Sequence, residues 1–198
     1  VDENRIFSKA GLEIINSDTR PGIKALCEVA GISHQPAFAE DVSFRLVPRL
    51  NAAGRMAHAS LALQLLTTDN IANARQLAQS LDKLNYQRRE IEQSILQGIL
   101  EDYQRQPDLL KNQTLVKWDP TWHQGVLGIV ASRIVETYYR PAILITVAGE
   151  MGKGSARSIP GLDLYKVLES CRHCLEDFGG HSMAAGLTIN AENLAEFQ

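Results

Sequence analysis

The sequence has little cysteine, few aromatic residues, no large excess of charge and no long apolar run. Three cysteines among 198 residues are too few for a disulfide framework, which favours a reducing, cytoplasmic compartment. No stretch approaches the roughly 18–20 apolar residues of a membrane span, and the first residues lack the pattern of a secretory signal. The formal net charge of −3 provides no global basic field, so a nucleic-acid partner would have to bind a local patch.

The first part of the chain is predicted to be short and broken. Helices are expected over residues 11–18 and 22–31, with Gly31 as the stop signal of the second. Residues 38–55 read as strand-like or irregular, because Pro48 interrupts them before a turn at "LNAAGR". The chain begins at Val1 rather than Met and stops inside a helical pattern, so we expect a piece of a longer protein.

A long amphipathic helix is predicted after a short helix over residues 60–67. From Ile71 to about Gln104, apolar residues recur at spacings of three, four or seven, and Asp69 and Asn70 are suitable caps. Such a helix would extend on the order of 50 Å at about 1.5 Å per residue. Its length and polar neighbours are typical of a connector between two lobes.

The last part alternates between strand and helix patterns. Strands are expected at residues 114–118, 140–149, 153–158 and 187–190, and helices over 126–139 and 163–178. The predicted fold class is α/β, with two lobes joined by the connector helix and a mixed β-sheet with packed helices in the C-terminal lobe.

Two stretches invite interpretations that their own spacing weakens. "CRHC", Cys171 to Cys174, resembles half of a zinc site but has no second ligand pair, so core packing of the cysteines is the favoured interpretation. "GEMGKGSARS" fails the Walker spacing, because Val147 stands where the first glycine belongs. It still offers donors for a phosphate on Lys153, Ser155, Arg157 and Ser158, although a solvated hairpin turn is about equally compatible.

Three more stretches could meet a ligand. His123 precedes a helix N-terminus, where it would either bind an anion or merely cap the helix. Asn51 and Arg55 flank a small-residue turn, where an arginine could contact phosphate or be simply solvated. "FGGHSMAAGL" combines Gly179, Gly180 and His181 with small residues, which lets something large approach the backbone.

Together these stretches resemble one family. "FGGHSMAAG" looks like the glycine-glycine-histidine signature of the DHH-associated domain, the accessory lobe of DHH phosphoesterases. "LNAAGR", "WHQGVLGIVASR" and "KGSARS" occur in the order found in RecJ single-strand-specific exonucleases, and residues 3–31 resemble the end of their catalytic domain. The chain departs from that pattern at Ala156, where a glycine is usual.

The resemblance implies hydrolysis of single-stranded DNA from its 5′ end in DNA repair and recombination, with Mn²⁺ or Mg²⁺ activating water. In the family the metal ligands, including an Asp-His-His motif, lie upstream; this sequence has no such motif, so we expect the chain alone to be inactive. The resemblance also implies three parts of the chain. Residues 1–57 would end a catalytic domain, 58–108 would form a helical connector, and 109–198 would form an incomplete DHH-associated domain.

The same resemblance implies roles for the residues that bind substrate. The connector would set the width of a cleft, with Arg55 reaching toward the scissile phosphate. The DNA backbone would be held by Asn51, Arg55, His123, Ser155, Arg157, Ser158, Gly179, Gly180 and His181. Two alternatives stay open: a stand-alone single-strand-binding module, and a related oligoribonuclease acting on short nucleotides. No protein partner is predicted.

Overall fold

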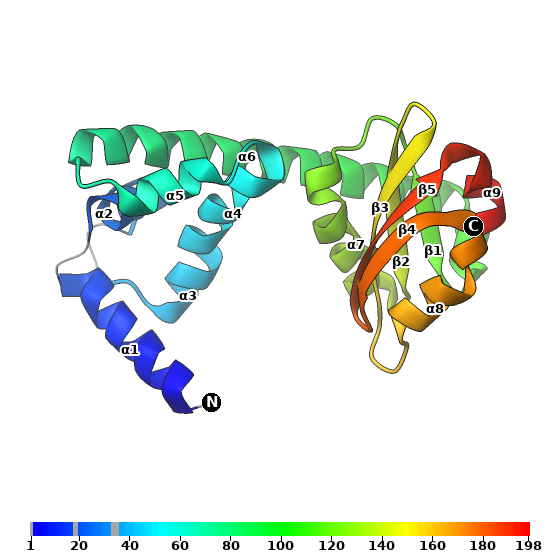
Figure 1. The fold of residues 1–198 in the computed structure, drawn as a ribbon, viewed down its shortest axis with the longest axis horizontal. Helices are drawn as coiled ribbons and strands as arrows, with labels where there is room; N and C mark the ends of the chain where they lie inside the picture. Colours follow the sequence, from blue (N-terminus) through cyan, green and yellow to red (C-terminus); the bar gives the residue numbers. More distant parts are fainter. Residues whose placement is uncertain (1, 18–19, 33–35) are drawn as a thin grey trace. The chain divides into compact units, whose positions relative to one another are not determined.

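The computed structural model describes residues 2–17, 20–32 and 36–198; Asp18, in the first expected helix, lies outside them. The chain divides into two compact units, Val1–Arg89 and Glu90–Gln198. Helix α6 (Ile71–Arg105) contributes residues to both, as predicted for a connector (Figure 1). The first half of this helix contributes Ala74, Ala78 and Leu81 to the core of the first unit.

The regular elements described in the first unit are all helical. Its core contains Leu26, Leu65 and Leu81, each fully buried. Helix α2 ends as predicted, because Gly31 adopts a left-handed conformation with φ 70°. Its elements are α1 (Asp2–Ser17), α2 (Pro21–Ala30), α3 (Ala39–Asp41), the π-helical turn η1 (Val42–Leu46), α4 (Val47–Met56) and α5 (Ser60–Thr67).

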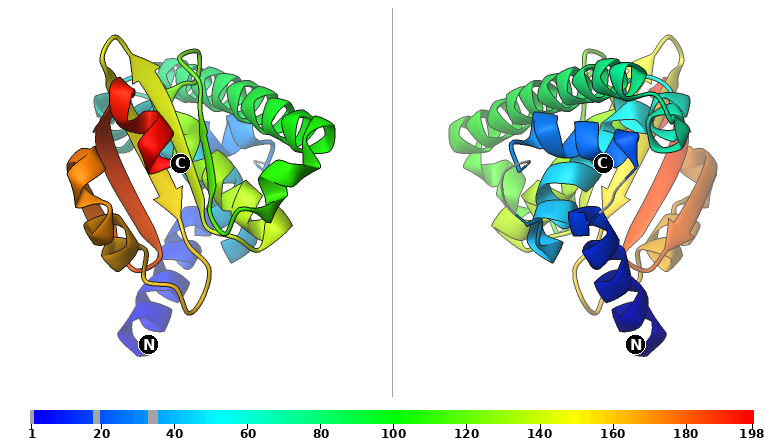
Figure 2. Two further views of the ribbon diagram at one scale, coloured as in Figure 1. Left: turned by 90° about the vertical axis from the view of Figure 1, so that its right-hand side faces the viewer. Right: turned by 90° about the vertical axis from the view of Figure 1, so that its left-hand side faces the viewer.

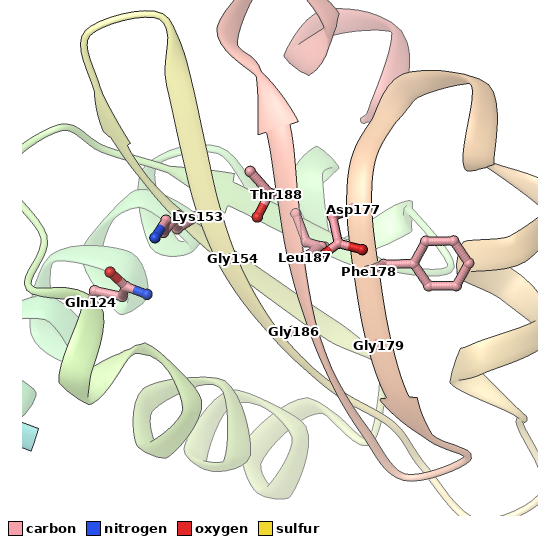
Figure 3. A pocket seen from close by; sticks show the side chains of 9 residues that line it. All are labelled: Gln124, Lys153, Gly154, Asp177, Phe178, Gly179, Gly186, Leu187 and Thr188. Atoms are coloured by element: carbon pink, nitrogen blue, oxygen red, sulfur yellow. The ribbon is translucent and has the colours of Figure 1, made fainter. Parts of the chain in front are cut away.

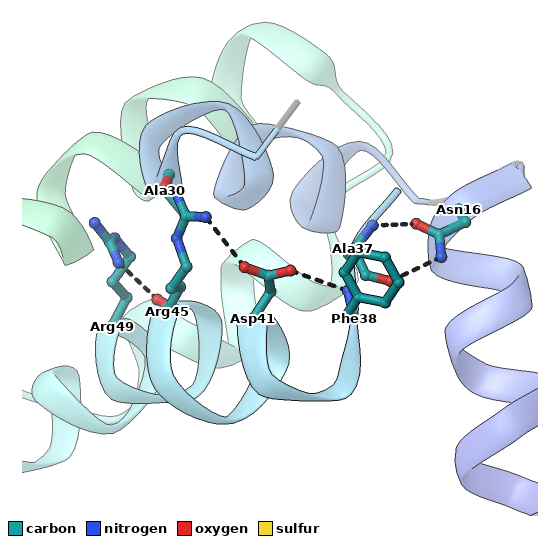
Figure 4. A network of polar contacts seen from close by, with 7 residues as sticks. All are labelled: Asn16, Ala30, Ala37, Phe38, Asp41, Arg45 and Arg49. Atoms are coloured by element: carbon teal, nitrogen blue, oxygen red, sulfur yellow. Dashed lines mark hydrogen bonds and ion pairs between the residues drawn. The ribbon is translucent and has the colours of Figure 1, made fainter. Parts of the chain in front are cut away.

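The expectation of a strand-like or irregular stretch over residues 38–55 is wrong, because this segment is helical. Asp41 accepts a hydrogen bond from the Phe38 backbone N–H at 3.0 Å and from Arg45 at 3.1 Å (Figure 4). These two bonds lower the pKa of the Asp41 carboxyl. Pro48 is the second residue of α4, which directly follows the π-helical turn η1, so the proline does not end the helical segment.

Helix α6 confirms the predicted amphipathic stripe. Leu81, Ile95 and Ile99 are buried, and Asn70 caps the helix by accepting from the Asn73 N–H at 3.0 Å. Its 35 residues correspond to about 52 Å at 1.5 Å per residue. Despite this length, neither α6 nor any other described helix is apolar enough to cross a membrane.

The second unit is built on a five-stranded mixed sheet with the strand order β1-β2-β3-β5-β4. Strands β1 and β2 are parallel, and the remaining pairs are antiparallel. This arrangement confirms the predicted fold class. The strands are β1 (Leu115–Trp118), β2 (Ala142–Ala148), β3 (Met151–Arg157), β4 (Leu175–His181) and β5 (Ala184–Asn190).

Helices cover the two faces of this sheet unequally. Helix α7 (Gln124–Tyr138) packs on β2 and β3, whereas α8 (Leu164–Ser170) packs on the opposite face against β4 and β5 (Figure 2). The α8 face holds a hydrophobic core that includes Ile145, Leu168 and Ile189. Helix α7 therefore leaves the part of its face that is formed by β4 and β5 uncovered.

The helix predicted over residues 163–178 is shorter than expected. After α8 comes the 3₁₀ turn η3 (Arg172–Cys174), and Leu175 already belongs to β4. Pairing of β4 with β5 is a tertiary interaction that overrides the local helical pattern. The chain then ends in η4 (Ala191–Asn193) and α9 (Leu194–Phe197).

Tyr103 predicts how the second unit responds to alkali. Burial, together with Tyr138 and Asp102, raises its pKa to about 12, above the value near 10 of an exposed phenol. The buried phenol therefore favours folding fully below about pH 10, and this contribution disappears as the pH rises toward about 12.

We expect Tyr103→Phe to lose less stability than the wild-type chain between pH 9 and pH 11 in chemical unfolding. Tyr139→Phe, at a position that is 66% exposed, is the matched control and should follow the wild type. Parallel losses in all three proteins would contradict this account of Tyr103.

Candidate nucleic-acid interface

The glycine-glycine-histidine motif lies at the β4–β5 hairpin, and the strand register brings it beside "KGSARS". Gly179 pairs with Gly186, which in turn pairs with Ser155 of β3. His181 pairs with Ala184, which pairs with Arg157 in the next row of the same face. A third row lies on the other side of the Gly179–Gly186–Ser155 row and consists of Asp177, Thr188 and Lys153. We call these three rows the glycine floor.

The floor lies on the face that carries α7. Alternation along each strand puts the floor residues on one face and Leu187 and Ile189 on the other. A hollow of about 320 Å³ lies over part of it (Figure 3). Gln124 at the start of α7 and Lys153 lie at one side of this hollow, whereas Phe178 points away from it. The hollow is lined by Gln124, Lys153, Gly154, Asp177, Phe178, Gly179, Gly186, Leu187 and Thr188.

The glycines of the motif differ in what their own chain requires. A Cβ on Gly180 would lie 2.3 Å from the Ala184 carbonyl oxygen, and its φ of 152° is unfavourable for other residues. A Cβ on Gly179 would meet nothing within 4 Å, and one on Gly186 only an oxygen at 3.9 Å. Gly180 is thus required by the hairpin backbone. At Gly179 and Gly186 a side chain would fit, and the glycines there leave an open surface.

Arg157 is held at one end of the floor by α7. Its Nη1 donates to the Ser155 hydroxyl at 3.2 Å and to the Ala156 carbonyl at 2.8 Å. A Cβ on Gly128 of α7 would lie 2.6 Å from Arg157 Nη2 and 2.9 Å from Ser155 Oγ. Gly128 therefore allows the helix backbone to press against both side chains. It was not among the site residues predicted from sequence, although a glycine inside a predicted helix signals a close approach.

Two histidines are oriented by backbone N–H groups. His181 Nδ1 accepts from the Met183 N–H at 3.2 Å, and His123 Nδ1 accepts from the Gly125 N–H at 3.1 Å. In each neutral ring the proton then resides on Nε2, which becomes a hydrogen-bond donor. His123 is half-buried and caps α7, as the simpler of its two interpretations predicted.

Ser158 lies beneath the hairpin rather than on the floor. Its hydroxyl is buried and donates to the Leu162 carbonyl at 2.9 Å, while its backbone N–H donates to Met183 at 3.0 Å. Together with the Leu164 N–H, which donates to the Ser182 carbonyl at 3.0 Å, it anchors the turn that carries His181. Ser158 therefore supports the hairpin instead of presenting a donor to solvent.

Asn51 and Arg55 belong to the other unit. The turn expected at "LNAAGR" is instead part of α4, and the spacing of four residues puts both exposed side chains on one helix face. The nearby arginines have structural partners: Arg45 pairs with Asp41, and Arg49 pairs with Asp82 at 2.7 Å. Arg55 lies in the last turn of α4.

The residues present do not fit a two-metal centre of hard cations. Among the described residues, the group of three potential ligands is His173, Cys174 and Glu196, which includes a thiol. Mg²⁺ and Mn²⁺ prefer carboxylate, carbonyl and water oxygens. Cys174 is buried, as core packing predicted, and burial together with Glu196 raises its pKa.

The chain is similar to known proteins of one family. A DHHA1 domain model matches residues 111–198. Single-stranded-DNA-specific exonuclease RecJ of Escherichia coli (strain K12) is 45% identical over 204 residues, covering 98% of this chain and 35% of that protein. Its namesake from Bacillus subtilis (strain 168) is 40% identical over 199 residues, covering 100% of this chain and 25% of the relative. Over residues 111–198 the chain matches the DHHA1 domain, and nearly the whole chain is similar to a part of the RecJ proteins.

A solved structure extends the RecJ match to three dimensions. The crystal structure of RecJ in complex with Mn²⁺ from Thermus thermophilus aligns with a TM-score of 0.85 and 37% identity. The alignment covers 98% of this chain but 28% of that one. This chain thus spans about a quarter to a third of the RecJ proteins it matches, and the floor lies within the DHHA1 match.

The neighbouring glycines provide a test with a built-in control. Gly180→Ala should destabilise the second unit by about 1–3 kcal/mol, because the added Cβ meets backbone and the φ is unfavourable. Gly179→Ala should leave the melting temperature unchanged or slightly higher, because its Cβ enters open space. Equal losses in thermal unfolding would show that Gly179, too, is a packing residue.

Proposed function

We propose that this chain is the part of a metal-dependent, single-stranded-DNA-specific exonuclease that holds the DNA backbone on the glycine floor. The observation that carries the proposal concerns Gly179 and Gly186. A Cβ added at either position would meet no atom closely, so the packing of the chain itself does not require glycine there. They are flanked in the strand register by Arg157 and His181. An open floor beside donor groups suits an approaching phosphate.

The chemistry of the floor supports backbone binding. A guanidinium and a histidine Nε2–H donate charge-assisted or directed hydrogen bonds to phosphate oxygens. Ser155, adjacent to Arg157, adds a hydroxyl. Contacts of this kind position nucleic acid without reading its sequence, as a non-specific nuclease needs.

The names of the relatives favour the exonuclease over an oligoribonuclease, since they specify single-stranded DNA. We infer Mn²⁺ or Mg²⁺ as cofactor of the whole enzyme, because RecJ structures contain these ions. No step of hydrolysis is assigned to residues of this chain, whose described ligand group does not suit those ions. Arg55 and Asn51 stay proposed phosphate contacts, and the domain limits 1–57, 58–108 and 109–198 stay proposed boundaries.

Arg157 provides the direct test of phosphate binding. Arg157→Ala should weaken binding of the chain to all single-stranded DNA sequences and reduce the slope of log affinity against log salt by about 0.7. Arg172→Ala removes the same charge from η3 and is the matched control. An unchanged slope for Arg157→Ala, measured by fluorescence anisotropy over several salt concentrations, would demote Arg157 to a structural residue.

Filling the floor tests the role of its open surface. Gly186→Val should reduce DNA affinity at least about tenfold, because two methyl groups would occupy the space proposed for the backbone. Stability should be retained, since a β-branched residue suits a strand and the site is open. The readouts are anisotropy for affinity and thermal melting for stability. Undiminished affinity in the folded variant would refute the proposed DNA position.

A further inference from the structure

A second cluster of chemically reactive side chains lies away from the floor, where η3 meets α9. The ligand atoms of His173, Cys174 and Glu196 all lie within 4.8 Å of one another. His173 Nε2 and Glu196 Oε1 are 3.6 Å apart. We propose that these three residues bind a transition-metal ion of the Zn²⁺ class, with water completing a tetrahedral site.

The fold places the Cys174 thiol where it can both pack in the core and meet a metal ion. Its side chain is 3% exposed, and its Sγ lies within 4.8 Å of the ligand atoms of His173 and Glu196. Within the described part of the chain, its Sγ has no hydrogen-bond partner. The thiol lies beside an imidazole and a carboxylate, and it becomes a soft metal ligand when it loses its proton. Metal binding would release that proton to solvent.

The donor set determines which metal is expected. Thiolate and imidazole ligands favour Zn²⁺ and Co²⁺, whereas Mn²⁺ and Mg²⁺ favour sites made of oxygen. The three donors therefore distinguish this site from a Mn²⁺ or Mg²⁺ centre. "CRHC" has no second ligand pair in sequence, but the fold brings Glu196 to it from 22 positions beyond Cys174.

A metal ion at this site would reinforce an existing contact between η3 and the C-terminal turns. Asn193 Nδ2 donates to the Cys174 carbonyl at 3.2 Å, so η4 and η3 are in contact before any ion binds. A metal bridging Cys174 and Glu196 would fasten α9 to η3. Metal binding should consequently stabilise the folded chain.

The experiment uses the full chain and Co²⁺ alone as a spectroscopic probe. We expect a sulfur-to-cobalt charge-transfer band that saturates at one Co²⁺ per chain and is abolished by Zn²⁺. Zn²⁺ should also raise the melting temperature, whereas Mn²⁺ and Mg²⁺ should not. Cys174→Ser should abolish the band, and Glu196→Gln should weaken Co²⁺ binding at least about tenfold.

Three controls keep the outcomes distinct. Cys27→Ser removes a thiol from the other unit and should leave the band unchanged, as should Cys171→Ser. Arg157→Ala, on the floor, should also bind Co²⁺ normally. If Cys174→Ser does not fold, Glu196→Gln decides alone, because its exposed side chain can change without disturbing the core. No band in the wild type, a band that persists in Cys174→Ser, or undiminished binding by Glu196→Gln would overturn the site.

Discussion

The pairing register of β5 with β3 and β4 is the constraint on which the glycine floor depends. Alternate residues of β5 face opposite sides, so Ala185, Leu187 and Ile189 enter the core while Gly186 and Thr188 face the floor. A slip of one residue would exchange Leu187 with Gly186, which would expose an apolar side chain and leave a void beneath α8. Burial of the apolar set therefore fixes the floor as firmly as it fixes the core.

Helix α7 turns this open surface into an asymmetric one. It presses on β3 at Gly128, where a side chain would collide with Arg157 and Ser155, and it starts at Gln124 beside the hollow. Arg157 is consequently held by Ser155 and Ala156 at one end of the floor. At the other end Asp177 lies in one row with Thr188 and Lys153, so the positive charge there is offset. The floor thus has one end that favours an anion more than the other.

Sequence reasoning found the stretches that form the floor but not the way they combine. It grouped Gly179 with Gly180, because both carry the same signal, whereas only the hairpin geometry separates an open glycine from an obligatory one. Ser158 was predicted to be a donor like Ser155, yet its hydroxyl is bonded to Leu162. The long helix was predictable because its periodicity is local. The helical segment around Pro48 was not, since it depends on contacts such as that of Arg49 with Asp82.

The same register shows why an alanine fits at position 156, where the sequence resemblance implies a glycine. Ala156 stands between Ser155 and Arg157 in β3, so its side chain faces away from the floor. It is fully buried in the cluster with Ile143, Ala185 and Leu164. The methyl group of Ala156 adds apolar contact to the core and leaves the glycine floor unaltered. One strand can therefore vary its core-facing positions independently of the residues that we propose hold DNA, because the two sets never share a face.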